Sequence, residues 1–373
     1  MKNALILNNT HSETDFINVL KKNYKKVYTI SNSKPFNKGT AIKHIKCDYK
    51  DYKKIKLLQN KYNISDTFPG ANDFTLFSLA HLKSEIIDHL SIIEILHNKE
   101  LFRNFIKRIK IYNPISLKKN INKIAYPLLA KPKLGHGGKG IVKIEDHRGL
   151  KLYIKNIKYI IEEFIEGSNH GIFTLVKNQK IIFIFFDTEQ RFLNPYTVSS
   201  TISSCNISSD VKLKIKKQLS KIIKKLKLKD GIFHCQIIFN KHEKKFYLIE
   251  ATRRLPGDNY LKFIRYSTGA FIEDYILKLF LKKKFKIELK KNSHILRKVL
   301  MSSSNGYFHR VKISKKIKKN IIEIKIFKQN GEKINNYLQD RVGVAFLKFK
   351  TKKTLLAITK NIDKFISVIT KKN

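Results

Sequence analysis

Short apolar runs alternate with segments of helical periodicity along the first part of the chain. The runs have the length and composition of buried strands. Between the first two runs, Phe16, Val19 and Leu20 recur at the spacing of one helix face. This βαβα order predicts a parallel sheet with crossover helices. The expected strands cover residues 4–7, 27–30 and 44–47, and the expected helices cover residues 16–20 and 52–60.

The remaining pattern predicts helices and antiparallel strands. Residues 76–83 form a predicted helix with Asn72 or Asp73 as its N-cap, and we interpret Asp73 as a cap rather than a catalytic group. Residues 97–114 form a predicted amphipathic helix with Leu101 on its apolar face. Further on, the pattern predicts a hairpin of residues 172–176 and 181–186, an irregular stretch at 187–209, a helix at 213–228, strands at 232–239, 245–250, 295–301, 321–327 and 342–350, and a final helix at 353–368.

A glycine-rich loop between two predicted strands is the main candidate binding site. In YPLLAKPKLGHGGKGI (residues 126–141), a strand at 127–131 leads into the loop, and a second strand follows. Glycines let the backbone bring N–H groups close to an anion, and Lys131 and Lys139 add cations. The loop therefore predicts a polyphosphate site, although a glycine-rich hairpin with chance lysines would look similar. It lacks both the Walker A pattern and the GxGxxG spacing of dinucleotide sites.

The charge of the chain is strongly basic, with 77 Lys and Arg against 29 Asp and Glu, or +48. Such a balance can indicate nucleic-acid binding. However, only ten of these cations are arginines, and the lysines are spread along the whole length. The chain is also rich in Lys, Ile and Asn and has no Trp. We therefore attribute the charge to an AT-rich genome and keep nucleic-acid binding as a minor alternative.

Cysteine usage and hydropathy indicate the compartment. Three cysteines without a CxxC pattern favour a reducing cytoplasm over a disulfide framework. The N-terminus does not resemble a signal peptide, and no run approaches the roughly 18 apolar residues of a membrane helix. We therefore expect a cytoplasmic protein without a membrane span.

Four motifs occur in an order that resembles the ATP-grasp superfamily of ligases. They are Asn98-Lys99 at a helix start, the Lys131 strand with its glycine loop, the segment IIEEFIEG, and Gln236 followed by Glu250-x-x-x-Arg254. The resemblance covers residues 1 to about 350. The pattern FPGANDF…HNKELFRNF is similar to that of ATP-grasp proteins akin to the large subunit of carbamoyl-phosphate synthase.

The resemblance implies an α/β (α+β) architecture with three domains. An N-terminal Rossmann-like domain would cover residues 1–95, and the ATP-grasp domain would cover residues 96–290 with a lid at about 122–190. A small β-rich domain would cover residues 291–373.

The resemblance also implies roles for individual residues. ATP would be held by Lys99, Lys131, Gly135, Gly137, Gly138 and Gly140, by the hinge residues Glu162, Glu163 and Ile165, and by Asn169 at the ribose position. Mg²⁺, which Mn²⁺ could replace, would be held by Gln236, Glu250 and Thr252, and Arg254 would be the catalytic residue.

The implied reaction joins a small-molecule carboxylate to an amine through an acyl phosphate, with ATP as the phosphoryl donor. Thr252 stands where the family usually has Asn, Gln236 where most members have an acid, and Asn169 where a glutamate is common. These departures leave a catalytically degenerate ATP-binding protein as an alternative. A homodimer is left open.

Overall fold

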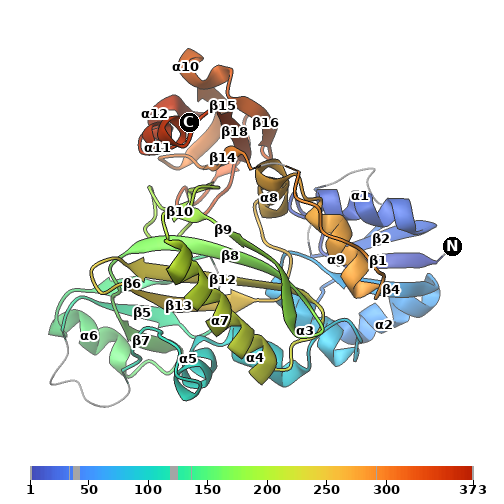
Figure 1. The fold of residues 1–373 in the computed structure, drawn as a ribbon. Coiled ribbons are helices and arrows are strands. Elements are labelled where there is room, and N and C mark those ends of the chain that lie inside the picture. The colour runs from blue at the N-terminus through green and yellow to red at the C-terminus, as the bar shows by residue number, and fades with distance from the viewer. Residues whose placement is uncertain are drawn as a thin grey trace.

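The computed structural model describes residues 2–32, 34–36, 43–117, 125–135, 137–290 and 292–371. Its N-terminal unit is the predicted parallel sheet, with the strand order β3-β2-β1-β4 (Figure 1). From β1 the chain runs to β2 and β3 on one side and then to β4 on the other. The carboxyl end of β1 is therefore a topological switch point. The elements are β1 (Asn3–Leu7), α1 (Thr14–Asn23), β2 (Lys26–Ser31), β3 (Lys43–Lys46), α2 (Tyr52–Lys61), β4 (Ile64–Pro69) and α3 (Asp73–His81).

Two short helices, α4 (Leu90–His97) and α5 (Lys99–Arg108), connect this unit to the rest of the chain. The predicted helix at 97–114 is shorter because Asn98 caps α5, its side chain accepting hydrogen bonds from Glu100 N and Leu101 N. Leu101 is 41% exposed, which contradicts its predicted burial, whereas the neighbouring Phe102 is buried. Asn72, rather than Asp73, caps α3 by accepting from Phe74 N.

The predicted hairpin around the glycine loop is present in a small antiparallel sheet of order β6-β5-β7. In Figure 1 this sheet and α6 lie at the opposite end of the molecule from the N-terminal sheet. The bounds are β5 (Leu128–Pro132), β6 (Val142–Ile144), α6 (His147–Ile154) and β7 (Tyr159–Glu163).

A nine-stranded sheet forms the centre of the molecule. The predicted hairpin of β8 and β9 is confirmed, with Asn178 and Gln179 both at positive φ in its turn. Residues 187–209 are not irregular throughout, because β10 and β11 pair there with each other. The elements are β8 (Ser168–Lys177), β9 (Lys180–Phe186), β10 (Thr188–Gln190), β11 (Ser200–Ile202), α7 (Ser209–Lys225), β12 (Gly231–Asn240), β13 (Lys245–Thr252), α8 (Tyr260–Thr268) and α9 (Ile272–Phe280).

C-terminal strands extend the same sheet, because β11 pairs with β14. One sheet therefore contains strands from both sides of the limit predicted at residue 291, and the predicted domain limits stay predictions. The final helix predicted at 353–368 is wrong: the chain forms two short helices and then a strand that pairs with β15. The elements are β14 (His294–Leu300), β15 (Gly306–Ile313), α10 (Lys315–Lys318), β16 (Ile321–Ile326), β17 (Lys333–Ile334), β18 (Gly343–Phe349), α11 (Lys352–Thr359), α12 (Ile362–Phe365) and β19 (Ile366–Lys371).

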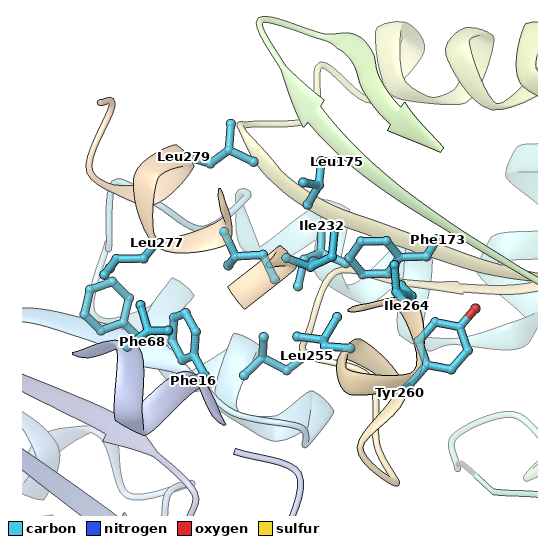
Figure 2. Close-up of a cluster of buried hydrophobic side chains, with 14 of the residues drawn as sticks. Phe16, Phe68, Phe173, Leu175, Ile232, Leu255, Tyr260, Ile264, Leu277 and Leu279 are labelled. Atoms are coloured by element: carbon cyan, nitrogen blue, oxygen red, sulfur yellow. The ribbon is translucent and has the colours of Figure 1, made fainter. Parts of the chain in front are cut away.

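A large hydrophobic cluster joins the N-terminal unit to the central sheet (Figure 2). Phe16 of α1 and Phe68 of β4 pack in the same cluster as Phe173 of β8, Leu255 and Leu277 of α9. Burial of aromatic and aliphatic side chains is the main stabilising contribution in such a cluster. It fixes the carboxyl edge of the N-terminal sheet beside the loop after β13. Within the part of the chain described here, no helix is both long and apolar enough to span a membrane.

Candidate active site

One large cavity, of about 790 Å³, is lined by residues of the small sheet, the central sheet, α5 and the C-terminal strands. Motifs that are far apart in the sequence meet here. The cavity brings together most of the predicted site residues, namely Lys99, Lys131, Gly135, Gly137, Gly138, Ile165, Asn169, Gln236, Glu250, Thr252 and Arg254. Gly140, Glu162 and Glu163 are not among its lining residues.

The glycine loop is held against the cavity by contacts from two other segments. Lys99 Nζ donates to Gly135 O at 2.8 Å, and Thr197 Oγ1 donates to Gly137 O at 3.0 Å. Gly138 has φ +74, and a Cβ there would lie 2.4 Å from Tyr196 O. A side chain at Gly138 would therefore push the loop away from this segment.

A buried ion cluster fixes Lys131 at the end of β5. Lys131 Nζ lies 2.7 Å from Glu162 Oε2, and Arg103 Nε lies 2.6 Å from Glu162 Oε1. Burial alone would raise the pKa of Glu162, but Arg103 and Lys131 outweigh it and hold this pKa at about 2. Two cations therefore share one carboxylate, and an excess positive charge remains at this end of the cavity for an anionic ligand.

We expect Lys131→Ala to weaken binding of Mg-ATP by about 10- to 100-fold, as the loss of a charge-assisted hydrogen bond predicts. Arg103 still neutralises Glu162 in this variant, so the protein should fold. Isothermal titration with Mg-ATP measures the effect. The control is Lys139→Ala, because Lys139 lies in the same loop but does not line the cavity. Equal affinities of Lys131→Ala and the parent would exclude the phosphate role.

The segment after β7 supplies another part of the cavity wall. Phe164, Ile165 and Glu166 line the cavity, whereas the Glu163 side chain accepts a hydrogen bond from Ile115 N at 2.8 Å. The carboxylate of Glu162 is occupied by its two cations. Adenine recognition by this hinge stays a prediction, and it would depend on its backbone and on Ile165.

The predicted metal residues face each other across two strands. Gln236 of β12 pairs in register with Glu250 of β13, and a bulge follows that bends the strand. Gln236 Nε2 donates to both oxygens of Glu189, at 2.7 and 2.8 Å, which leaves Gln236 Oε1 available as a ligand. No ion-pair partner of Glu250 is found among the described residues.

These oxygens fit Mg²⁺, which takes one or two protein oxygens and completes its shell with phosphate and water. The described part of the chain has no group of three His, Cys, Asp or Glu residues that could hold a metal alone. A phosphate-bearing ligand would therefore supply the remaining ligands.

Thr252 has a contact that the sequence did not indicate. Its hydroxyl donates to Asp73 Oδ1 at 2.9 Å, and Arg254 Nε lies 3.1 Å from Asp73 Oδ2. Burial would raise the pKa of Asp73, but Arg254 and, to a smaller extent, other neighbours outweigh it and lower this pKa, so Asp73 is ionised at neutral pH. Asp73 therefore orients Arg254 toward the cavity, and the role of Thr252 as a metal ligand stays a prediction.

Arginine usage is a signal that the sequence reasoning missed. Half of the ten arginines line this cavity, but among the lysines that the structure describes only three do. A planar guanidinium binds carboxylate and phosphate in ways that lysine cannot, so arginine persists where this chemistry is needed. Arg253 is the opposite case: it forms a buried ion pair with Asp88 at 2.7 Å and does not line the cavity. The lining arginines are Arg103, Arg191, Arg254, Arg297 and Arg341.

Two antiparallel sheets that enclose lysines, a glycine loop and paired metal-type oxygens define the ATP-grasp class of proteins. The family model of the ATP-grasp domain matches residues 96–257, and this part of the chain is an ATP-grasp domain. A sequence comparison with curated proteins finds no match. The finer likeness to carbamoyl-phosphate synthase stays a prediction.

Solved structures of similar fold cover nearly the whole chain. An L-amino acid ligase from Bacillus licheniformis has a TM-score of 0.84 at 17% identity, covering 100% of this chain and 99% of its own. N5-carboxyaminoimidazole ribonucleotide synthetase from Thermotoga maritima has a TM-score of 0.80 at 14% identity, covering 100% of both chains. A third structure is the biotin carboxylase domain of a Hydrogenobacter thermophilus 2-oxoglutarate carboxylase, in complex with MgADP and bicarbonate. Its TM-score is 0.75 at 14% identity, and the match covers 99% of this chain and 90% of that domain's chain. At these identities the similarity concerns the fold.

Proposed function

We propose that this protein is an ATP-dependent ligase that joins a carboxylate to an amine. The observation that carries the proposal is the single cavity in which Lys99 and Lys131 lie with Gln236, Glu250 and Arg254. The two lysines suit the phosphates of ATP. Gln236 and Glu250 suit Mg²⁺, and Arg254 suits a transferred phosphoryl group. The neighbour crystallised with MgADP has the same fold and supports this choice of cofactor.

The proposed reaction has two steps. A carboxylate oxygen attacks the γ-phosphorus of ATP, the bond to the β-phosphate oxygen breaks, and ADP leaves with its electron pair. The amine nitrogen then attacks the acyl carbon, phosphate leaves, and the nitrogen loses a proton to give the amide. Activation is needed because a free carboxylate has no good leaving group, and the phosphate supplies one.

Individual side chains would contribute position and charge rather than covalent chemistry. Lys99 and Lys131 would hold the phosphates, and Arg254, oriented by Asp73, would stabilise charge on the transferred group. Gln236 and Glu250 would hold Mg²⁺, which would offset the negative charge of the phosphates. The three free cysteines agree with a reducing cytoplasm. Cytoplasmic location and a homodimer belong to this proposal.

A second candidate is an ATP-binding protein without ligase activity. The observation that favours it is the Thr252 hydroxyl, whose proton is given to Asp73, at the position where relatives usually offer an amide oxygen. Turnover separates the two candidates, because both bind Mg-ATP.

We expect Mg-ATP to stabilise the protein and to be converted to ADP in the presence of the right substrates. At about 100 times its dissociation constant, a ligand adds about 2.7 kcal/mol of stability. Thermal unfolding with and without Mg-ATP measures the first part, and ADP release across a set of carboxylates and amines measures the second. Absence of a thermal shift at millimolar Mg-ATP would contradict both candidates, whereas a shift without ADP release favours the second.

A further inference from the structure

A second, smaller cavity of about 320 Å³ lies at the carboxyl edge of the N-terminal sheet. Its walls come from the segments after β1, β2, β3 and β4 and from the loop before α8. Ligands of open parallel sheets bind at this edge, in the crevice beside the switch point. Its volume is at the lower end of the range for small-molecule sites. The lining residues are Asn8, Thr10, His11, Ser12, Ser31, Asn32, Tyr49, Ala71, Asn72, Gly257 and Asp258.

A buried glutamate holds the walls of this cavity in place. Glu13 is fully buried and accepts hydrogen bonds from Asn8 Nδ2, from Thr10 N and Oγ1, and from Ala71 N. Behind it, Gly70 is so close to β1 that a Cβ would lie 2.2 Å from Leu7 O. One carboxylate therefore connects the segments after β1 and β4, and the cavity is formed before any ligand arrives.

Backbone strain is concentrated around the same cavity. Asn8 has φ +106, and Asp258 has φ +52, values that non-glycine residues rarely adopt. Such conformations persist only where surrounding contacts enforce them, and they are enriched at ligand sites. The strain is thus a second, independent observation at this edge of the sheet.

The lining has a distinct chemistry. It consists mainly of amides and hydroxyls, and no lysine or arginine is among the lining residues in the described part of the chain. This is unusual in a protein with 77 such cations. The acidic group is Asp258, whose oxygens lie 3.4 Å from His11 Nε2 and 3.3 Å from Arg341 Nε. A carboxylate or phosphate would find no cation in this lining, whereas a neutral group could both donate and accept hydrogen bonds.

Tyr49 shows the hydrogen-bonding capacity of this wall. Its hydroxyl accepts a hydrogen bond from Asn72 Nδ2 at 2.9 Å, so its own proton can be donated to a ligand. Burial, with smaller effects of Asp48 and Glu13, raises the pKa of Tyr49, and the hydroxyl keeps this proton at neutral pH.

The small cavity adjoins the large cavity, because Ala71, Gly257 and Asp258 line both. Arg254 lines the large cavity and is close in sequence to Gly257 and Asp258, which line both cavities. A substrate could therefore place its reacting group beside Arg254 and its remaining part in the small cavity.

We propose that the small cavity binds the non-reacting part of a substrate, and that this part is uncharged and rich in hydroxyl or amide groups, as in a sugar ring or a carboxamide. This substrate class rests on the proposed ligase function, while the binding site itself does not. Binding measured in the absence of ATP separates the two.

Binding of neutral probes to the full-length protein, without ATP, tests the site directly. The probes are glucose, N-acetylglucosamine and acetamide, each compared with a charged analogue: glucuronic acid, N-acetylglucosamine 6-phosphate and acetate. We expect saturation-transfer NMR and calorimetry to show millimolar or tighter binding of at least one neutral probe, and at least about tenfold weaker binding of its charged analogue. Comparing the sugar probes with the amide probe shows whether the cavity binds hydroxyl groups or a carboxamide.

Tyr49→Phe should weaken binding of that probe by about three- to tenfold, as expected for one lost hydrogen bond. Tyr52→Phe is the matched control, since Tyr52 lies nearby, stacks on His81 and does not line the cavity. Ser12→Ala gives a second variant in the same lining if Tyr49→Phe does not fold.

The outcomes separate the two proposals. Failure of every neutral probe to bind, equal or tighter binding of the charged analogues, or unchanged binding by both lining variants would overturn the small-cavity proposal. Mg-ATP binding and ADP release are measured on the same samples. If these are present while the probes do not bind, the ligase function stands alone; if the probes bind and Mg-ATP does not, only the ligase function fails.

Discussion

Glu250→Gln is expected to lower ADP release by about 10²- to 10³-fold, the range found when one preorganised electrostatic contact is lost. Glu250 lines the cavity in register with Gln236, whose own amide N–H group is engaged with Glu189. Glu250 is therefore the carboxylate that can bind Mg²⁺ without first losing another partner among the described residues. Glutamine keeps the size of the side chain but removes its charge, so the effect reports charge rather than packing.

Phe164, Ile165 and Glu166, where adenine is predicted to bind, should be unaffected by this change, because they follow β7 of the small sheet rather than β13. ADP release across a Mg²⁺ titration, together with nucleotide binding in the absence of Mg²⁺, separates metal binding from nucleotide binding. Glu243→Gln is the control, since Glu243 lies in the turn between the same two strands and outside the cavity. A Glu250→Gln variant as active as an active parent would show that the metal site lies elsewhere.

The parts of the site that the sequence predicted are those defined by local patterns. The strand, glycine loop and second strand around residues 128–144 are contiguous, so their hairpin could be inferred from composition alone. Gln236 and Glu250 belong to two strands joined by a short turn, which places them on one hairpin. The pairing register was not readable, because it depends on the bulge after Gln236.

The contacts that the sequence did not predict are those between distant segments. Asp73 and Thr252 are 179 positions apart, and only the packing of α3 against the end of β13 brings them together. Asp73 therefore looked like a helix cap, a role that its neighbour Asn72 fills. In the same way, the stretch predicted as the end of the last helix becomes β19 because its β-branched residues pair with β15, a partner more than fifty residues earlier.

Domain division is another property that local patterns do not determine. The resemblance implied a β-rich domain from residue 291, and β14, which follows this limit, pairs with β11 and continues the central sheet. Arg297 of β14 thereby reaches the cavity, where its Nη2 donates to Thr201 Oγ1 at 2.7 Å. The C-terminal strands thus contribute directly to the site, and their removal would open one of its walls.

Replacing Arg254 with alanine is expected to lower kcat by about 10³-fold, because a positioned arginine is worth about that much or more in phosphoryl transfer. Its guanidinium is fixed by Asp73 and by Leu255 O, to which Nη1 donates at 2.9 Å. Arg254→Lys keeps the charge but cannot reproduce both contacts, and it should recover only part of the activity. Asp73→Asn removes the carboxylate that orients Arg254 and should reduce kcat less than Arg254→Ala does.

The order of these effects distinguishes a catalytic arginine from a structural one. Steady-state ADP release gives kcat and KM for each variant, thermal unfolding reports its stability, and Arg310→Ala serves as an exposed control that does not line the cavity. If Arg254 acts on the transferred group, kcat should fall in the order parent, Asp73→Asn, Arg254→Ala, while the KM for ATP changes little. A loss that appears only as reduced stability, or equal kcat values for Arg254→Ala and Arg310→Ala, would instead assign Arg254 to the ion pair with Asp73 alone.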